Sequence, residues 1–194
     1  MITIMLDSSN TSMSVGLMDD KHLIASTSYE ACQRQSEVMI PELDKLLNDN
    51  GFTKDDIQDV IVAIGPGSYT GVRIAITIAK TLAVALNIPI FTVSSLHVLK
   101  DGDNPSICLI NARSKRSYIG VYQKDKCLLQ DGIMTNDEVN EYIKEHPNYS
   151  ICGNVEYLGI AGKKSDIIQE MFSLKKDLSP IDNPLALTPV YLKD

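Results

Sequence analysis

The sequence predicts an α/β protein in which one order of strands and helices is used twice. Two observations in the first half predict this class: three strands joined by tight turns, and a buried parallel β-α-β unit between residues 60 and 93. A third is that an order of three strands, a helix and a strand begins again near residue 106. The two halves share no visible sequence identity, so the duplication is inferred from the order of the elements.

An antiparallel meander and a helix open the chain. Turn-forming residues at 8–11 and 19–21 separate three runs of strand-forming residues. The strands are expected at residues 2–7, 12–18 and 22–30. A helix is expected at residues 36–48, because apolar side chains recur on one of its faces. Pro41 must either lie in the first turn of this helix or kink it.

A buried strand that runs straight into a glycine-rich turn is the most informative segment. The β-branched run at residues 60–64 is typical of a strand covered on both faces, and a Gly-Pro-Gly turn interrupts it. Ser68 or Thr70 can cap the helix that follows. This helix is expected to end before Pro89, which precedes a further strand at residues 90–93.

The second half repeats the first in a shorter form. Its strands are expected at residues 106–111, 117–123, 127–133 and 149–152. Thr135 and Glu138 form a capping box for a helix that ends near Glu145. We expect an N-terminal lobe at residues 1–103 and a smaller C-terminal lobe at residues 104–194. The end of the second lobe is rich in prolines and is expected to pack as an extended segment.

No phosphate-binding or nucleophile motif fits the glycine-rich turn. A Walker A loop needs a second glycine followed by lysine, but Thr70 stands five residues after Gly65. Thr70 also replaces the third glycine of the dinucleotide fingerprint, and a nucleophile elbow around Ser68 would lack both of its glycines. The glycines are therefore predicted to be structural, at positions where a Cβ atom would clash. They are Gly65, Gly67 and Gly71.

The helix behind this turn is more apolar than packing on one sheet requires. One face is suited to covering a sheet and carries Ile74, Ile78, Leu82 and Ala85. The adjoining face has a small residue at every fourth position, at 71, 75, 79 and 83. Small residues let a second helix approach closely. That helix can come from the same chain or from another, and the short chain favours an intermolecular partner.

Composition limits the classes of function. The 194 residues carry a net charge of −7, which disfavours tight binding of a nucleic-acid backbone by the chain alone. The basic residues at 113–116 are expected to form either a solvated turn or a phosphate contact. The cysteines at 32, 108, 127 and 152 are scattered and are expected to be free buried thiols. With no leader sequence and no apolar run long enough to cross a bilayer, a soluble cytoplasmic protein is expected.

The order of elements and the turn together resemble a known family. A βββαβαβ unit followed by a reduced copy is the layout of the duplicated ribonuclease H-like fold shared by actin, sugar kinases and the seventy-kilodalton chaperones (Hsp70). Residues 65–74 and 79–83 closely resemble the signature of the TsaB (YeaZ-like) family of bacterial tRNA threonylcarbamoyladenosine biosynthesis proteins. Shorter matches lie at residues 6–9, 36–37, 111–113, 153–154 and 189–192.

The resemblance implies an accessory subunit. Proteins of this family pair with the related catalytic subunit TsaD, which modifies the adenosine 3′ of the anticodon in tRNAs that read codons beginning with A. It therefore implies that ATP or ADP and a divalent metal ion bind TsaD, and that this chain has no cofactor, catalytic residue or metal site of its own. It also implies that TsaE acts through the complex, that tRNA is bound indirectly, and that a homodimer forms when TsaD is absent.

The resemblance also assigns two groups of residues. In this family the first helix and the signature helix form a bundle with the equivalent helices of TsaD. The implied partner-binding residues are Met39, Ile40, Leu43, Leu47, Arg73, Ile76, Ala79, Lys80 and Ala83. In active members of the fold, a hairpin loop binds phosphate through backbone N–H groups. The corresponding loop here has no glycine, which implies a vestigial site at Asp7, Ser8 and Ser9.

Two other functions remain open. Asp7 favours an autonomous ATPase or phosphotransferase of the actin and sugar-kinase type, whereas the missing glycines disfavour it. A protease is the other alternative, because relatives were labelled glycoproteases. The sequence offers neither a Ser-His-Asp set nor a pair of metal ligands in its support.

Overall fold

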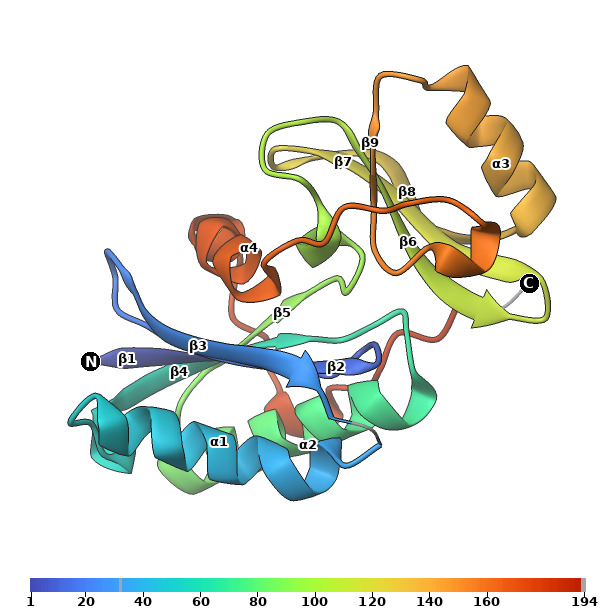
Figure 1. The fold of residues 1–194 in the computed structure, drawn as a ribbon. Helices are drawn as coiled ribbons and strands as arrows, with labels where there is room; N and C mark the ends of the chain where they lie inside the picture. Colours follow the sequence, from blue (N-terminus) through green and yellow to red (C-terminus); the bar gives the residue numbers. More distant parts are fainter. Residues whose placement is uncertain (32, 193–194) are drawn as a thin grey trace.

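Two β-sheets, one from each half of the chain, organise the computed structural model, which describes residues 1–31 and 33–192 (Figure 1). The first sheet has five strands in the order β3-β2-β1-β4-β5, and the second has four in the order β8-β7-β6-β9. Each sheet therefore places the third, second, first and fourth strands of its half side by side. This common order confirms the predicted duplication and the reduction of the second copy.

The first sheet combines the predicted meander with the predicted β-α-β unit. β1 pairs antiparallel with β2, and β2 with β3, whereas β4 runs parallel to both β1 and β5. The parallel strands are buried on both faces, which explains their continuous apolar sequence. The strands are β1 (Ile2–Asp7), β2 (Ser12–Met18), β3 (Leu23–Glu30), β4 (Ile57–Ala63) and β5 (Ile90–Val93).

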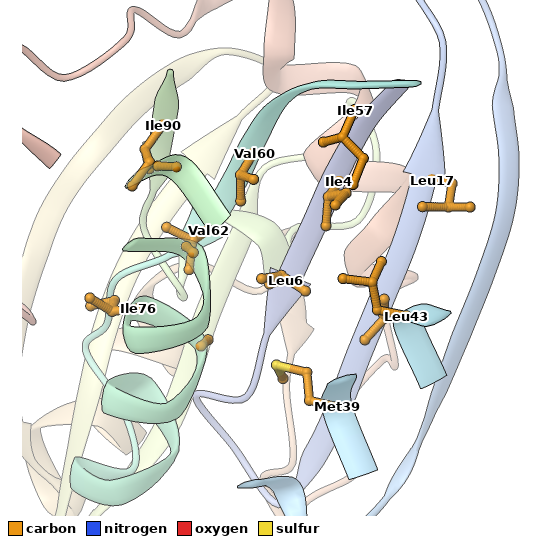
Figure 2. Close-up of a cluster of buried hydrophobic side chains, with 14 of the residues drawn as sticks. Ile4, Leu6, Leu17, Met39, Leu43, Ile57, Val60, Val62, Ile76 and Ile90 are labelled. Carbon is orange, nitrogen blue, oxygen red and sulfur yellow. The ribbon is translucent and has the colours of Figure 1, made fainter. Parts of the chain in front are cut away.

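Two helices, α1 (Gln35–Asp49) and α2 (Tyr69–Leu86), cover one face of the first sheet (Figure 1). Figure 2 shows Met39 of α1 and Ile76 of α2 among the sheet residues of this core. Pro41 lies inside α1 and beyond its first turn, so of the two alternatives the place in the first turn is wrong.

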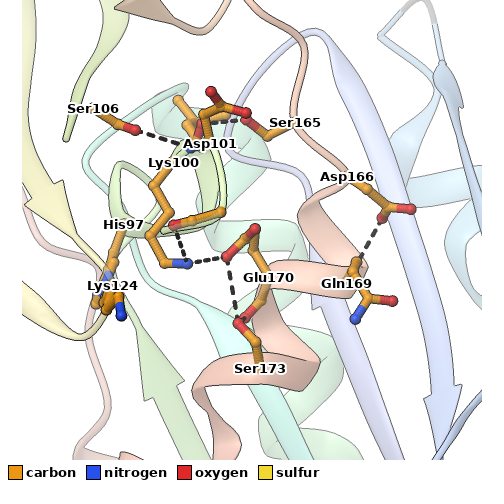
Figure 3. Close-up of polar contacts among 12 residues, drawn as sticks. His97, Lys100, Asp101, Ser106, Lys124, Ser165, Asp166, Gln169, Glu170 and Ser173 are labelled. Atoms are coloured by element: carbon orange, nitrogen blue, oxygen red, sulfur yellow. Dashed lines mark hydrogen bonds and ion pairs between the residues drawn. The ribbon is translucent and has the colours of Figure 1, made fainter. Parts of the chain in front are cut away.

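The opposite face of the first sheet is covered by α4 (Ile167–Leu174), which the sequence analysis did not predict. Side chains alternate along a strand, so Met5 points at α4 while its neighbours in β1 point at α1 and α2. Figure 3 shows that Glu170 of α4 forms an ion pair with Lys100, which follows the first sheet. These two side chains are only 13% and 5% exposed, so the pair is shielded from solvent.

The second sheet carries one helix, α3 (Asn136–Glu145), as predicted. The helix begins at the predicted capping box, in which Thr135 and Glu138 satisfy each other's backbone N–H groups. Val139 packs into the core of this sheet. The strands are β6 (Ser106–Arg113), β7 (Arg116–Gln123), β8 (Lys126–Thr135) and β9 (Ser150–Cys152).

The chain returns to the first sheet once the second is complete. Both α4 and the C-terminal segment pack on the first sheet, although they lie in the predicted C-terminal lobe of residues 104–194. The C-terminal segment is hydrogen-bonded beside the first sheet, since Ile181 N–H donates to Ile90 O at 2.9 Å and Val190 N–H donates to Ile64 O at 2.8 Å. Short 3₁₀ turns complete the fold at Lys54–Asp56, His97–Leu99, Glu156–Leu158, Lys175–Asp177 and Pro184–Ala186.

The expectation that no apolar run is long enough to cross a bilayer is wrong for α2. Its 18 residues have a mean hydropathy of 1.4, so by length and composition alone this helix could cross a membrane. In the structure α2 lies on the first sheet, and its buried side belongs to the core that Figure 2 shows. The contact of α2 with the sheet therefore accounts for part of its apolar composition.

The cysteines differ in part from the expectation of buried thiols. Cys108 and Cys152 are buried and free, and they face each other as partners on the parallel strands β6 and β9. Cys127 is free but exposed on β8, so the prediction of burial is wrong for this residue. Cys32 lies outside the described residues.

Candidate functional site

The glycine turn before α2 packs against the loop between β1 and β2. A Cβ atom at Gly67 would lie 2.3 Å from Ser9 O, and one at Gly71 would lie 1.8 Å from Ser8 O. Ser8 Oγ donates a hydrogen bond to Gly71 O at 2.7 Å, and Ser68 N–H donates to Ser9 O at 2.7 Å. Gly67 and Gly71 are therefore needed for the close contact of the β1–β2 loop with the glycine turn and the first turn of α2.

Gly65 meets a different segment. Its φ of 102° lies in the region that favours glycine, and a Cβ atom there would lie 2.8 Å from Val190 O. Its N–H donates to Ser95 Oγ at 3.0 Å. The turn is therefore closed against the C-terminal segment on one side and against the β1–β2 loop on the other.

The expected phosphate loop is closed by this packing. Asp7, Ser8 and Ser9 are at most 3% exposed. Burial raises the pKa of the Asp7 carboxyl, although the Ser9 N–H bonded to Asp7 Oδ1 at 3.0 Å opposes the shift. Asp7 Oδ2 has no hydrogen-bond partner among the described residues. The chain's own turn covers these three residues, and the expectation of a vestigial phosphate site stays a prediction.

Most of the implied partner-binding residues lie in the chain's own core. Six of the nine are at most 7% exposed: Met39, Leu43, Leu47, Ile76, Ala79 and Ala83. For the three on α2, the physical reason is that this helix presents the adjoining face to the sheet instead of the face that was expected to cover it. Its small residues face the sheet and let the helix lie close to the strands, whereas Ile74, Ile78 and Leu82 are only partly buried. The six buried side chains are therefore not available to a partner.

A groove remains open along α1 and α2. Its volume is about 420 Å³, and its lining residues are Ser36, Tyr69, Thr70, Arg73, Ile74, Thr77 and Ile78. Ile40, one turn after Ser36 on the same face of α1, is 46% exposed. We call the lining residues together with Ile40 the α1–α2 groove. It combines apolar side chains with hydroxyl groups and one guanidinium group.

The two basic residues implied for partner binding take different positions. Arg73 lines the groove, with its guanidinium 5.1 Å from the centre of the Tyr69 ring and Nη1 donating to Tyr69 Oη at 2.5 Å. Lys80 Nζ instead donates to Leu185 O at 2.8 Å and to Leu187 O at 3.2 Å. Arg73 therefore belongs to the open surface, whereas Lys80 holds the C-terminal segment.

Within residues 1–31 and 33–192, no three His, Cys, Asp or Glu side chains lie close enough together to hold a metal ion. His97 stacks on Tyr122 with ring centres 4.1 Å apart, and His146 stacks on Tyr142 at 4.2 Å. Burial lowers the pKa of His97, which favours its neutral form. That a divalent metal binds a partner rather than this chain stays a prediction.

Comparison with known sequences links this chain to one family. Residues 28–177 match the family model described as TsaD: tRNA N6-adenosine threonylcarbamoyltransferase. The tRNA threonylcarbamoyladenosine biosynthesis protein TsaB of Bacillus subtilis is 37% identical over 134 residues, which cover 67% of this chain and 58% of that protein. The Escherichia coli protein of the same name is 31% identical over 146 residues, with coverage of 72% and 61%. The matched region thus spans about three fifths of these relatives.

Solved structures share the fold over the whole chain. YeaZ from Pseudomonas aeruginosa has a TM-score of 0.81 at 21% identity, over 98% of this chain and 99% of that one. A second structure from the same organism, described as similar to peptidase YEAZ, has the same score and covers 99% of both chains. These matches, together with the two related sheets, confirm the ribonuclease H-like architecture. The chain belongs to the TsaB/YeaZ group within the TsaD family of tRNA threonylcarbamoyladenosine proteins.

Proposed function

We propose that the chain is an accessory subunit in the synthesis of threonylcarbamoyladenosine in tRNA, and that it binds a TsaD-type catalytic protein through the α1–α2 groove. The observation that carries this proposal is the open groove on the two helices that the family resemblance assigns to partner binding. Ile40, one helical turn after the lining residue Ser36, is 46% exposed. Exposed apolar side chains rimmed by polar groups are typical of protein–protein contact sites.

The β1–β2 loop supports an accessory rather than a catalytic role. A carboxyl that is buried and has a raised pKa, as Asp7 has, is a poor ligand for a magnesium–nucleotide complex. ATP or ADP and the divalent metal ion then bind the TsaD-type partner, and TsaE and tRNA engage the complex in the cytoplasm. The burial of Asp7, the residue that favours an autonomous ATPase, weighs against that alternative. Among residues 1–31 and 33–192, no group of three His, Cys, Asp or Glu side chains offers a metalloprotease its metal ion.

The same groove accounts for self-association when the partner is absent. Two copies can cover each other's apolar residues, and each copy then loses the surface that a TsaD-type protein would occupy. A stable pair buries roughly 800 Å² on each side. Homodimer and heterodimer are therefore proposed to be mutually exclusive.

Reconstitution tests this proposal. The TsaD-type protein and the other pathway proteins of the same organism are incubated with tRNA, with and without this chain, and the modified nucleoside is measured by mass spectrometry. We expect modification only when the chain is present. Full modification without the chain, or threonylcarbamoyl transfer by the chain alone, would overturn the accessory role.

A matched pair of variants tests the groove. Ile40 on α1 and Leu128 on β8 are both 46% exposed, so Ile40→Glu and Leu128→Glu introduce the same charge at equal exposure. We expect Ile40→Glu to weaken binding to the TsaD-type protein by at least about tenfold, because charge is depleted at interface centres. Leu128→Glu is expected to bind like the wild type. Equal affinities for the two variants would exclude the groove as the contact.

A further inference from the structure

The C-terminal segment is fastened along α2 by polar contacts. Lys80, in the middle of the helix, donates two hydrogen bonds from Nζ to the carbonyl oxygens of Leu185 and Leu187. Further along, Val190 N–H donates to Ile64 O at 2.8 Å. We call residues 184–191 the C-terminal strap. A charged amine that donates to two carbonyl groups forms stronger hydrogen bonds than neutral partners would, so the strap has a defined position.

The strap ends at the rim of the α1–α2 groove. The ring of Tyr191 stacks on that of Tyr69, with centres 5.2 Å apart and planes inclined by 23°. The guanidinium of Arg73 lies 5.1 Å from the centre of the same Tyr69 ring. The two tyrosines are 45% and 61% exposed, so the stack is a surface feature. We call Tyr69, Arg73 and Tyr191 the aromatic patch.

Arg73 is the group of the patch with unused bonding capacity. Its hydrogen bond to Tyr69 uses one of five N–H donors. Throughout the described part of the chain, no carboxylate forms an ion pair with it, although Asp and Glu outnumber Lys and Arg by 25 to 18. The groove beside it adds the hydroxyl groups of Thr70 and Thr77.

We propose that the C-terminal strap completes the docking surface, and that the aromatic patch it forms receives a carboxylate-bearing segment of the partner. Arginine binds carboxylates through two parallel N–H donors, and the hydrogen bond and cation–π contact with Tyr69 hold the guanidinium at this place. Aromatic residues and arginine also dominate the energetic centres of protein interfaces. Lys80 is then a positioning residue, because it acts through the strap. This inference rests on the proposed function, since it specifies the chemistry of the same contact.

Binding of the chain to the TsaD-type protein of the same organism, measured by calorimetry, tests the patch. We expect Arg73→Glu and Tyr191→Ala each to raise the dissociation constant by at least about tenfold. The matched controls lie on β8, where Lys126→Glu makes the same change in charge and Leu128→Ala removes an apolar side chain of similar exposure. Both controls are expected to bind like the wild type.

A double-mutant cycle tests the positioning role of Lys80. Lys80→Met keeps most of the length of the unbranched side chain and removes both hydrogen bonds to the strap. If Lys80 acts by holding Tyr191, the double variant Lys80→Met/Tyr191→Ala binds no more weakly than Tyr191→Ala alone. Additive losses would show that Lys80 contacts the partner itself, which would overturn the role assigned to the strap.

The outcomes separate this inference from the function on which it rests. If the wild-type chain does not bind the TsaD-type protein, the proposed function fails and the inference fails with it. If the wild type binds, but Arg73→Glu and Tyr191→Ala bind as tightly as their controls, only the inference is overturned. Thermal unfolding of each variant verifies that it is folded.

Discussion

Gly67 and Gly71 set the position of α2 at the scale of single residues. Each lies where a Cβ atom would overlap a backbone oxygen of the β1–β2 loop, so a larger side chain at either position would push the helix away from the sheet. The same approach buries Asp7 and leaves its Oδ2 without a partner among the described residues. The close packing of helix and loop therefore removes the Asp7 carboxyl from water, which is unfavourable for folding.

The burial of Asp7 gives the fold a pH dependence of defined sign. Burial raises the pKa of this carboxyl above its ordinary value of 3.8, so the folded chain keeps a proton that the unfolded chain has already released. The free energy of unfolding therefore falls as the pH rises from 3.8 to the raised pKa, and it stays lower above that range. Asp7→Asn cannot ionise and keeps an acceptor for Ser9 N–H, so we expect it to lack this decline. Urea unfolding at a series of pH values measures how the free energy of unfolding changes with pH in the wild type and in Asp7→Asn.

An exposed carboxyl provides the control for this measurement. Hydrogen bonds from the N–H groups of Lys21 and His22 lower the pKa of Asp19, so its contribution to stability is lost as the pH falls. Asp19→Asn should therefore change the slope in the opposite direction to Asp7→Asn. Identical slopes for Asp7→Asn and the wild type would mean that Asp7 does not titrate in this range.

At the scale of the element, α2 separates what the sequence could predict from what it could not. Its bounds follow from local chemistry, since Ser68 caps the start and Asn87 adopts a left-handed conformation before Pro89. Which side meets the sheet was predicted wrongly. Two adjoining faces are apolar, and periodicity alone does not say that the face with small residues approaches the strands more closely.

Contacts between residues far apart in the chain could not be predicted from the sequence either. The contact of Lys80 with the C-terminal strap joins residues 105 and 107 positions apart, which no local pattern encodes. The missed helix α4 did carry a local signal, because Asp166 caps it and Ile168 and Met171 lie on one face. Its eight residues are fewer than a periodicity search needs to separate a helix from a short buried strand.

The attachment of α4 to the first sheet depends on a shielded ion pair at its end. Lys175 Nζ donates to both carboxylate oxygens of Asp59, at 3.0 and 2.7 Å, and also to Thr3 Oγ1. The two charged side chains are 18% and 10% exposed. We expect Lys175→Ala to lower the free energy of unfolding by about 3 kcal/mol, because it leaves a buried carboxylate without its partner.

The neighbouring lysine is a suitable control in the same denaturant titration. Lys176 is 75% exposed and lies 3.9 Å from Asp177, so Lys176→Ala should change the free energy of unfolding by less than about 0.5 kcal/mol. If the two variants are equally stable, the ion pair with Asp59 does not hold α4 in place.

At the scale of the whole molecule, the second sheet is inserted into the first lobe. Residues 106–152 form it, and the chain then returns to add α4 and the C-terminal strap to the first sheet. The shielded pair of Lys100 and Glu170 lies where the chain leaves and rejoins this lobe (Figure 3). The second sheet is the reduced copy of the fold. The α1–α2 groove lies on the helices of the first copy.

The net charge of the whole molecule predicts that the chain alone binds tRNA weakly. Affinity for a phosphate backbone comes largely from Lys and Arg that displace counterions, and this chain has a net charge of −7. Its one basic cluster lies at the β6–β7 turn, where Arg113 and Lys115 are exposed. We therefore expect the isolated chain to bind tRNA with a dissociation constant above about 100 µM at physiological salt, as measured by fluorescence anisotropy. Tight binding that Arg113→Glu abolishes would contradict an indirect role, because the turn would then contact tRNA itself.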